Sequence, residues 1–324
     1  MTGSASAPVL VQDVDQLVTA LAAQDARVLG ARGAAGARET GSAAASGAPV
    51  QTHAAPRYRR AVVMTMGALH AGHLSLVRAA KQRADVVVVT IFVNPLQFGP
   101  SEDLDRYPRD LAGDLALLSG PGLLGPDDVV LAPTPAVMYP GGDPVVRVSA
   151  GPIGTVLEGA VRPGHLDGVL TVVLKLMNLT RPDVALFGRK DAQQLAAVRA
   201  MVRDLDVPVL VEGVPIVRDD DGLALSSRNA YLTPTDRHRA LALSRSLAAG
   251  RDRAAAGGTP DEVRRAARAV LDEAVDAVDY VALVDPDTFT ELQDGAVGTA
   301  LLAVAARVGG TRLIDNTDVE LIGR

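Results

Sequence analysis

The sequence predicts an α/β protein in which helices cover a parallel sheet, followed by a smaller C-terminal α+β domain. An unbroken apolar run at Val86–Val93 is typical of a strand buried on both faces, as in a parallel sheet. The order strand, glycine-containing turn and helix start occurs at Ala61–Ala84 and again from Asp183. After Tyr231 the composition shifts towards alternating helices and strands. A length of 324 residues also favours two domains.

The composition and charge of the chain exclude several classes of protein. The chain is 48% hydrophobic and 22% charged, as is usual for a globular protein. The net charge of −6 argues against a nucleic-acid partner, and no apolar stretch approaches the length of a membrane span. The absence of cysteine excludes disulfides. The first residues lack a basic end followed by an apolar block, so we expect a cytoplasmic protein with no membrane partner.

The N-terminal part contains an unusual segment. Val9–Leu29 has the spacing of an amphipathic helix, whereas Gly30–Pro56 is rich in Ala, Gly and Ser and predicts a flexible or poorly ordered insertion. A helical piece within its alanines remains open. We expect deletion of Gly30–Pro56 to leave the reaction rate of the purified variant nearly unchanged. A collapse of folding or activity would show that the segment is structural.

The first strand, turn and helix contain the strongest chemical signal. Ala61–Met64 is β-prone, and the helical spacing begins after His70-Ala-Gly-His73. Gly67 and Gly72 permit close backbone approach, and the start of a helix offers free N–H groups to a phosphate. Two histidines three apart can donate to phosphate oxygens, and each can carry charge near neutral pH. A chance match, or half of a zinc site, is the alternative.

Polar residues follow the next strand and recur later in the chain. Asn94 and Gln97 come directly after the apolar run, where α/β folds bind ligands, although turn chemistry also suits Asn94. Asp127–Ala132 and Val145–Val148 are predicted strands. Leu157–Val169 combines glycines with ionisable side chains and predicts a ligand-facing loop, or otherwise a solvated connector. Leu170–Thr180 returns to helical spacing.

A second turn of the same kind follows the strand Asp183–Phe187. It consists of Gly188-Arg189-Lys190-Asp191, in which Lys190 suits a phosphate. Asp191 suits a helix cap, a ribose hydroxyl or a magnesium ion. After a strand at Val209–Val217, Leu225-Ser-Ser-Arg228 predicts a clamp on phosphate oxygens, or otherwise an exposed polar turn.

The C-terminal elements show none of the glycine–histidine chemistry. Helices are predicted from Thr233 to about Ala249 and from Gly257 to about Ala277, the latter with Thr259 as N-cap. The predicted strands of the small sheet are Val278–Val284, Ala300–Val308 and Thr311–Ile314.

Together, these motifs resemble those of the pantoate–β-alanine ligase family within the HxGH nucleotidyltransferases. The matching segments are Thr65–His73, Ile91–Phe98, Arg162–His165, Gly188–Asp191 with Gln194, Asp221–Asn229 and Thr311–Asn316. The resemblance implies a Rossmann-like catalytic domain at residues 1–217, a smaller lid domain at residues 218–324, and a homodimer. It also implies that ATP and pantoate give pantoyl adenylate and pyrophosphate, after which the amine of β-alanine displaces AMP and gives pantothenate.

The resemblance further implies roles for individual residues. The catalytic groups would be His73, treated as the acid, with His70, Lys190 and Arg228. The ATP-binding residues would be Met66, Gly67, Ala68, Leu69, His70, Ala71, Gly72, His73, Gly188, Arg189, Lys190, Asp191, Val217, Leu225, Ser226, Ser227 and Arg228. Pantoate and β-alanine would meet Gln97 and Gln194, with Asn94, Tyr107, Glu158 and His165 as further contributors. Mg²⁺ would bridge phosphate oxygens and would need few ligands from the protein.

The chain departs from the family pattern at a few positions. Met64, Ala71, Leu166, Arg189 and Ala192 replace the usual residues. Of these, Arg189 adds a positive charge that we expect to lie beside the nucleotide and to alter ATP affinity. Two other functions stay open at this point: a nucleotidyltransferase that stops at a nucleotide adduct, and a non-catalytic nucleotide-binding protein. A dinucleotide dehydrogenase is disfavoured because the first turn has no GxGxxG motif.

Overall fold

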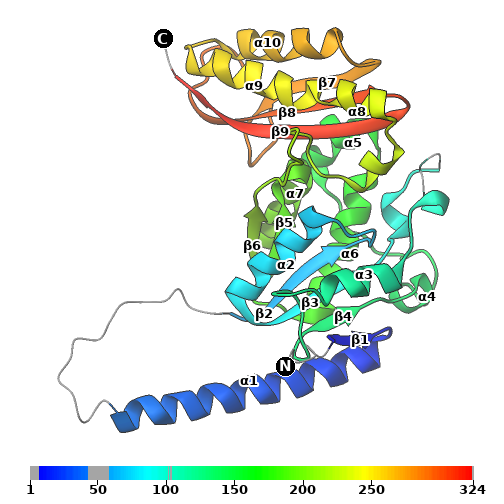
Figure 1. Ribbon diagram of the computed structural model, residues 1–324, viewed down its shortest axis with the longest axis vertical. Helices are drawn as coiled ribbons and strands as arrows, with labels where there is room; N and C mark the ends of the chain where they lie inside the picture. Colours follow the sequence, from blue (N-terminus) through cyan, green and yellow to red (C-terminus); the bar gives the residue numbers. More distant parts are fainter. Residues whose placement is uncertain (1–6, 43–57, 101, 103, 323–324) are drawn as a thin grey trace.

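The computed structural model describes residues 7–42, 58–100, 102 and 104–322, and two sheets organise them. In Figure 1 the larger sheet and its helices form the lower part of the molecule, and the smaller C-terminal sheet with its helices forms the upper part. The predicted fold class is therefore confirmed: a parallel six-stranded α/β domain precedes a smaller antiparallel one.

The larger sheet places two glycine turns side by side. Its strands, all parallel, stand in the order β1-β4-β3-β2-β5-β6. Their bounds are β1 Val9–Val11, β2 Tyr58–Thr65, β3 Ala84–Ile91, β4 Val129–Leu131, β5 Val184–Gly188 and β6 Leu210–Val214. The order reverses between β2 and β5, which pair directly, with Ala61 opposite Val184. Such a switch point opens a crevice at the carboxyl ends of the strands, where α/β proteins bind ligands.

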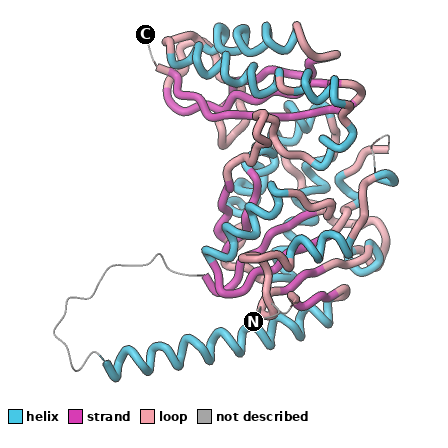
Figure 2. Tube along the Cα trace, in the orientation of Figure 1, coloured by secondary structure: helices cyan, strands magenta, loops and turns pink. Residues whose placement is uncertain are grey.

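Helices cover both faces of this sheet (Figure 2). The helices of this part of the chain are α1 Val14–Ser42, α2 Ala71–Arg83, α3 Leu111–Leu118, α4 Pro135–Met138, α5 Leu157–Val161, α6 His165–Thr180 and α7 Ala192–Asp204. Because strand side chains alternate, Val62 and Val88 pack in the core cluster that includes α6 and α7. Val63 and Val87 pack in the opposite cluster, which includes α2. All four valines are fully buried, as the apolar runs predict.

The C-terminal domain is an antiparallel sheet in the order β7-β8-β9. Its elements are α8 Pro234–Ala240, α9 Ala242–Ala255, α10 Pro260–Asp272, β7 Ala277–Val284, β8 Gly298–Val308 and β9 Thr311–Leu321. The three helices pack with the sheet in one core cluster. As predicted, Thr259 caps α10, in a capping box with Glu262. A separate cluster joins Ala282 and Ala303 of the sheet to Ala196 of α7, and so connects the two domains.

The structure corrects several boundaries. Val9–Val11 is a strand that pairs with β4 rather than the start of a helix. Val145–Val148 forms no strand, and Val145 is fully exposed at 101%. Leu157–Val169, predicted as a loop, consists of α5, a turn at Arg162–Gly164 and the start of α6. The predicted helix from Thr233 to Ala249 is split into α8 and α9.

The predicted insertion is only partly described. The backbone of α1 continues through Gly30 to Ser42, so the helical piece that the sequence analysis left open within the alanines is present. The remainder, residues 43–56, lies outside the described residues. Among the helices that the structure describes, none combines the length and hydropathy that a membrane span requires.

Candidate functional site

The predicted turns meet at one cleft at the switch point of the sheet. A cavity of ≈ 250 Å³ lies there and is lined by Met66, His70 and Gly188, among others. A second cavity of ≈ 730 Å³ extends from it towards the C-terminal domain and is lined by Tyr280 and Arg312. The residues that line both cavities are Arg162, His165, Lys190, Asp191, Gln194, Ser226 and Arg228. The two cavities are therefore parts of one site that both domains build.

The turn after β2 is held by a carboxylate that the sequence analysis missed. Gly67 and Ala68 both have positive φ angles, of 82° and 51°. The buried Asp114 of α3 accepts the Leu69 N–H at 2.8 Å and the Ala68 N–H at 3.1 Å. Burial raises the pKa of Asp114. A side chain at Gly67 would place its Cβ 2.9 Å from this carboxylate, so the position requires glycine.

The two histidines direct the same ring atom away from the backbone. Nδ1 of His70 accepts the Gly72 N–H at 3.2 Å, and Nδ1 of His73 accepts the His70 N–H at 3.3 Å. The ring centroids are 4.2 Å apart, and both residues line the smaller cavity. A neutral imidazole that accepts at Nδ1 has its proton on Nε2. The pair therefore offers two Nε2–H donors at the opening turn of α2, as a phosphate site needs.

The structure contradicts the expectation that these imidazoles carry charge near neutral pH. Burial, with a smaller contribution from His70, lowers the pKa of His73 to about 3. Burial and the neighbouring Lys190 also lower the pKa of His70. Both groups are neutral donors at pH 7, and the cationic side chains that line the smaller cavity are Lys190, Arg228 and Arg162, the last of which is paired with Glu102.

This pKa shift predicts acid sensitivity. Unfolded His73 binds a proton below about pH 6.5, whereas folded His73 does not until about pH 3, so its contribution to stability is lost as the pH falls between these values. We expect the free energy of unfolding to fall less steeply with acid in His73→Gln than in the parent chain. Urea titrations at pH 7 and at lower pH test this, and parallel pH dependences would contradict it.

Asn94 and Gln97 follow β3 and are linked to each other. Asn94 is 1% exposed, and its Nδ2 donates to Oε1 of Gln97 and to the Gly168 carbonyl, both at 3.1 Å. Its Oδ1 accepts from the Tyr139 hydroxyl at 2.9 Å. The amide of Asn94 is thus used within the chain, whereas Gln97 contacts Met66 and lines the smaller cavity. Asn94 holds Gln97 in place.

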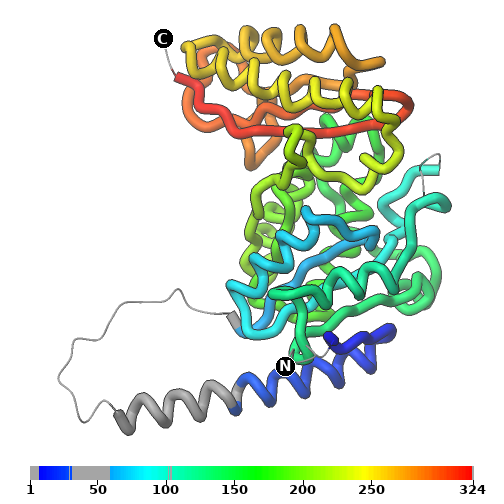
Figure 3. Tube along the Cα trace, in the orientation of Figure 1, coloured from blue at the N-terminus to red at the C-terminus, as the bar shows by residue number. Residues whose placement is uncertain are grey.

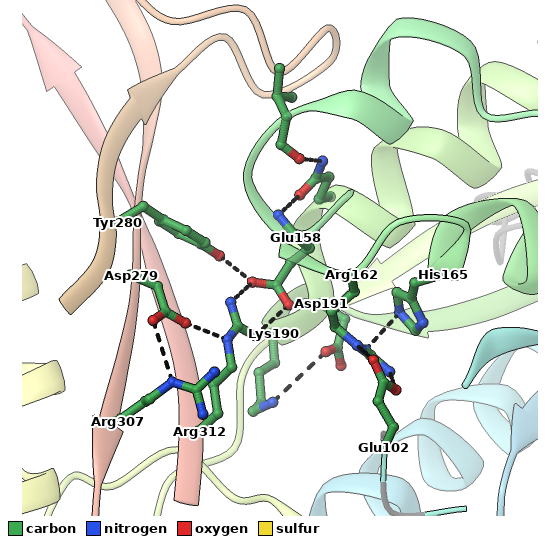
Figure 4. Close-up of polar contacts among 12 residues, drawn as sticks. Glu102, Glu158, Arg162, His165, Lys190, Asp191, Asp279, Tyr280, Arg307 and Arg312 are labelled. Carbon is green, nitrogen blue, oxygen red and sulfur yellow. Dashed lines mark hydrogen bonds and ion pairs between the residues drawn. The ribbon is translucent and has the colours of Figure 1, made fainter. Parts of the chain in front are cut away.

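Arg162 and His165 both contact the Gln97 carbonyl, and Figure 4 shows them together with Glu102. Arg162 forms a two-point ion pair with Glu102 at 2.5 and 2.8 Å, and its Nη1 lies 3.0 Å from Nε2 of His165. Because arginine only donates, Nε2 of His165 accepts, and its Nδ1–H donates to the Gln97 carbonyl at 2.8 Å. Burial and Arg162 lower the pKa of His165. Tyr107 lines the same cavity and contacts Phe98 edge-on.

Glu158 connects the two domains. Figure 4 shows its carboxylate between Tyr280 and Arg312, at 2.8 Å from the hydroxyl and at 2.6 and 2.7 Å from the guanidinium. Asp279 accepts from Nε of the same arginine at 2.5 Å. The Glu158 N–H donates to the buried Gln193, which in turn holds the segment before α5. The carboxylate predicted to meet substrate is thus engaged in an inter-domain ion pair.

The turn after β5 separates its charged residues. Lys190 lines both cavities, and its Nζ lies 3.8 Å from Oδ1 of Asp191. Arg189 instead contacts Asp318 of β9 at 3.0 Å and is half exposed, so the expectation that its charge lies beside the nucleotide is not met. Asp191 is the N-cap residue of α7 but makes no side-chain capping bond, so the helix cap is not the role that its side chain takes among the three left open.

The serine–arginine motif follows a short hairpin. The Leu225 N–H donates to the Val217 carbonyl at 3.0 Å, which closes the hairpin. Ser226 then starts a 3-10 turn, and its Oγ accepts the Arg228 N–H at 3.3 Å. Ser226, Ser227 and Arg228 all line the smaller cavity opposite the histidines' turn. The predicted phosphate-binding groups therefore come from three separate segments.

The cleft contains few candidate metal ligands. In the part of the chain that the structure describes, no group of three His, Cys, Asp or Glu side chains is arranged to hold a metal. Asp191 is the one carboxylate among the described residues that line the smaller cavity. This donor set fits Mg²⁺ bound mainly by phosphate oxygens, which needs only one or two protein carboxylates.

Several residues of the site escaped the sequence analysis. They are Asp114, Tyr139, Gln193, Tyr280 and Arg312. Asp114 had a signal, since it is the single charged residue in the apolar stretch Leu111–Leu118. The other four make contacts between segments that are far apart in the chain, and a local sequence pattern does not predict such contacts.

Comparisons with known proteins agree with this geometry. The family model described as pantoate–β-alanine ligase matches residues 43–318. The pantothenate synthetase of Streptomyces avermitilis is 53% identical over 82% of this chain and 94% of its own, and that of Thermobifida fusca is 58% identical over 81% and 90%. The crystal structure of the Thermus thermophilus pantothenate synthetase superposes with a TM-score of 0.79 at 44% identity, covering 95% of this chain and 98% of that one. A Francisella tularensis pantoate–β-alanine ligase, described as a complex with a βγ-ATP ligand and β-alanine, gives a TM-score of 0.69 at 29% identity, covering 96% and 97%.

Proposed function

This chain belongs to the pantoate–β-alanine ligase family and forms the amide bond between pantoate and β-alanine with ATP, and on that premise we propose how its residues carry out the reaction. The first step is attack of the pantoate carboxylate on the α-phosphorus, which forms pantoyl adenylate and expels pyrophosphate. In the second step the β-alanine amine attacks the acyl carbon and forms the amide bond. The bond between the acyl carbon and the phosphate oxygen breaks, and AMP leaves with its electron pair. One proton is lost from the amine.

The phosphates bind at the cleft between the two turns. His70 and His73 donate through Nε2, while Lys190 and Arg228 neutralise charge from the opposite segments. Attack on phosphorus needs positioned donors and cations, and needs no protein nucleophile. One observation supports this assignment above the others: four donors from three distant segments line one cavity at the switch point. Met66 to His73, Gly188, Lys190, Asp191, Val217 and Leu225 to Arg228 surround the nucleotide, whereas the Arg189 side chain contacts Asp318.

Gln97 and Gln194 hold pantoate, with Gln97 also beside β-alanine. Both glutamines line the smaller cavity, together with Tyr107 and His165. Asn94 and Glu158, which were predicted as further contacts, contribute through other residues because their side chains are bonded within the chain. Asn94 orients Gln97, and Glu158 joins α5 to the C-terminal sheet.

The proposed function also includes a bound Mg²⁺, two domains with different roles, and a homodimer. Mg²⁺ bound to the triphosphate, with Asp191 as the available carboxylate, supplies charge neutralisation when present. Residues 1–217 form the catalytic domain and residues 218–324 a lid. The protein acts as a cytoplasmic homodimer on small molecules. Sedimentation at several concentrations tests the oligomeric state.

Product analysis tests the chemistry. We expect mass spectrometry to detect pantoyl adenylate when the chain is incubated with ATP, Mg²⁺ and pantoate, and pantothenate once β-alanine is added. A stable nucleotide adduct that β-alanine does not consume would instead support a nucleotidyltransferase. ATP binding without any product over hours would support a non-catalytic protein.

A further inference from the structure

Two neighbouring residues of β9 reach both cation-bearing loops of the cleft. Asp315 and Asn316 are 3% and 6% exposed, although they belong to the C-terminal sheet. In Figure 3 the red strand β9 runs beside the yellow-green chain that follows β6. The sequence motif Thr311–Asn316 matched the family, but neither the sequence nor the proposed reaction assigns these two side chains a role.

Asn316 holds the turn that presents Lys190. Its Nδ2 donates to two consecutive backbone carbonyls, those of Arg189 at 3.0 Å and Lys190 at 2.8 Å. A single amide nitrogen has two hydrogens and therefore satisfies both carbonyls. These bonds fix the backbone from which the Lys190 side chain enters both cavities. Aspartate at this position could not replace Asn316, because its carboxylate only accepts hydrogen bonds and would face two backbone carbonyls that also only accept.

Asp315 holds the hairpin that precedes the serine–arginine motif. Its carboxylate accepts from both terminal nitrogens of Arg218, at 2.6 and 2.9 Å. The same guanidinium donates to the Gly222 carbonyl at 3.1 Å, which ties the two arms of the hairpin together. The Asp315 carboxylate also accepts the Asn316 N–H at 2.8 Å. Asp315 and Asn316 are therefore hydrogen-bonded to each other, and together they contact the hairpin through Arg218 and the Lys190 turn through its carbonyls.

We propose that Asp315 and Asn316 are positioning residues that set the Lys190 turn and the Ser226–Arg228 loop relative to each other. The proposal rests on the function proposed above. It implies that the C-terminal domain contributes to the geometry of adenylation, and does more than cover a finished site. A displacement of about 1 Å in such groups costs up to about 100-fold in rate.

A double-mutant cycle tests the Asn316 arm. We expect Asn316→Ala to lower kcat/KM for ATP by about tenfold or more in the parent chain. If Asn316 acts through Lys190, the same change made in Lys190→Ala should cost less than about twofold, because the group it positions is already gone. Equal losses in the two backgrounds would overturn the proposal. A thermal melt of each variant separates this effect from unfolding.

Three further variants of β9 serve as controls and as a second test. Asp318→Asn removes the half-exposed contact of β9 with Arg189 and should leave kcat/KM within about twofold, as exposed ion pairs contribute little. Should Asn316→Ala fail to fold, Asn316→Ser replaces it, since its hydroxyl can donate to one carbonyl. Asp315→Asn, crossed with Arg228→Ala, tests the other arm in the same way. Failure of Lys190→Ala to reduce activity would refute the proposed function, whereas additivity alone refutes only this inference.

Discussion

Replacing His73 with alanine is expected to lower kcat/KM for ATP by about 10²–10³-fold while the chain stays folded. The change removes an Nε2–H donor aimed into the cleft, and it leaves the His70 N–H without its acceptor. Loss of one preorganised donor to a developing charge has this order of effect. Because His73 is neutral in the folded chain, the loss reflects hydrogen bonding and not a lost ion pair. Initial rates of pyrophosphate release with pantoate present measure it.

His238→Ala serves as the matched control. His238 is an exposed residue of α8, away from both cavities, and its replacement should leave the rate unchanged. Turnover of His73→Ala at the parent rate would show that the assignment of the phosphate site is wrong. A circular dichroism melt close to that of the parent confirms that the variant is folded.

Replacing Asp114 with alanine is expected to reduce both stability and activity. The buried N–H of Leu69 and the partly buried N–H of Ala68 would lose their acceptor, at a cost of about 1–3 kcal/mol for a buried donor left unsatisfied. The left-handed turn at Gly67 and Ala68 would lose the group that holds it, and α2 with its histidines would shift. We therefore also expect a loss in kcat/KM of about 100-fold. Urea unfolding and steady-state kinetics on the same preparation measure the two effects.

Asp110 gives a close comparison. It lies on the same helix start and caps α3 by accepting the Gly113 N–H at 2.9 Å, outside the cleft. Asp110→Ala should cost about 1 kcal/mol of stability and leave kcat/KM unchanged. If Asp114→Ala behaved like Asp110→Ala in both measurements, the carboxylate would not be what holds the turn.

The buried strands were predictable because their apolar runs report a local requirement. A central parallel strand is shielded from water on both faces, so all of its side chains are apolar. The run Val86–Val89 is therefore typical of such a strand. Both glycine turns were predictable because each stands between a β-prone run and the start of helical spacing, and Gly67 indeed adopts a positive φ. These signals identify the strands and turns that border the cleft, whereas the strand order that makes β2 and β5 neighbours comes from the structure.

Other features depended on contacts that the sequence does not display. Leu157–Val169 contains so many polar and glycine residues that its composition predicts a loop, but Leu157, with a φ angle of 44°, begins α5, and Gly164, with a φ angle of 80°, immediately precedes α6. Glu158 looks like a substrate contact until its distant partners Tyr280 and Arg312 are known. The neutral state of the histidines follows from burial, which spacing does not reveal.

The most direct test of the account is a coupled assay of AMP and pyrophosphate release in which pantoate and β-alanine are each omitted in turn. If the groups at the cleft activate a pantoate carboxylate against ATP, pyrophosphate will form only when pantoate is present, and sustained AMP release will also need β-alanine. Pyrophosphate released without pantoate, or ADP as the nucleotide product, would contradict it.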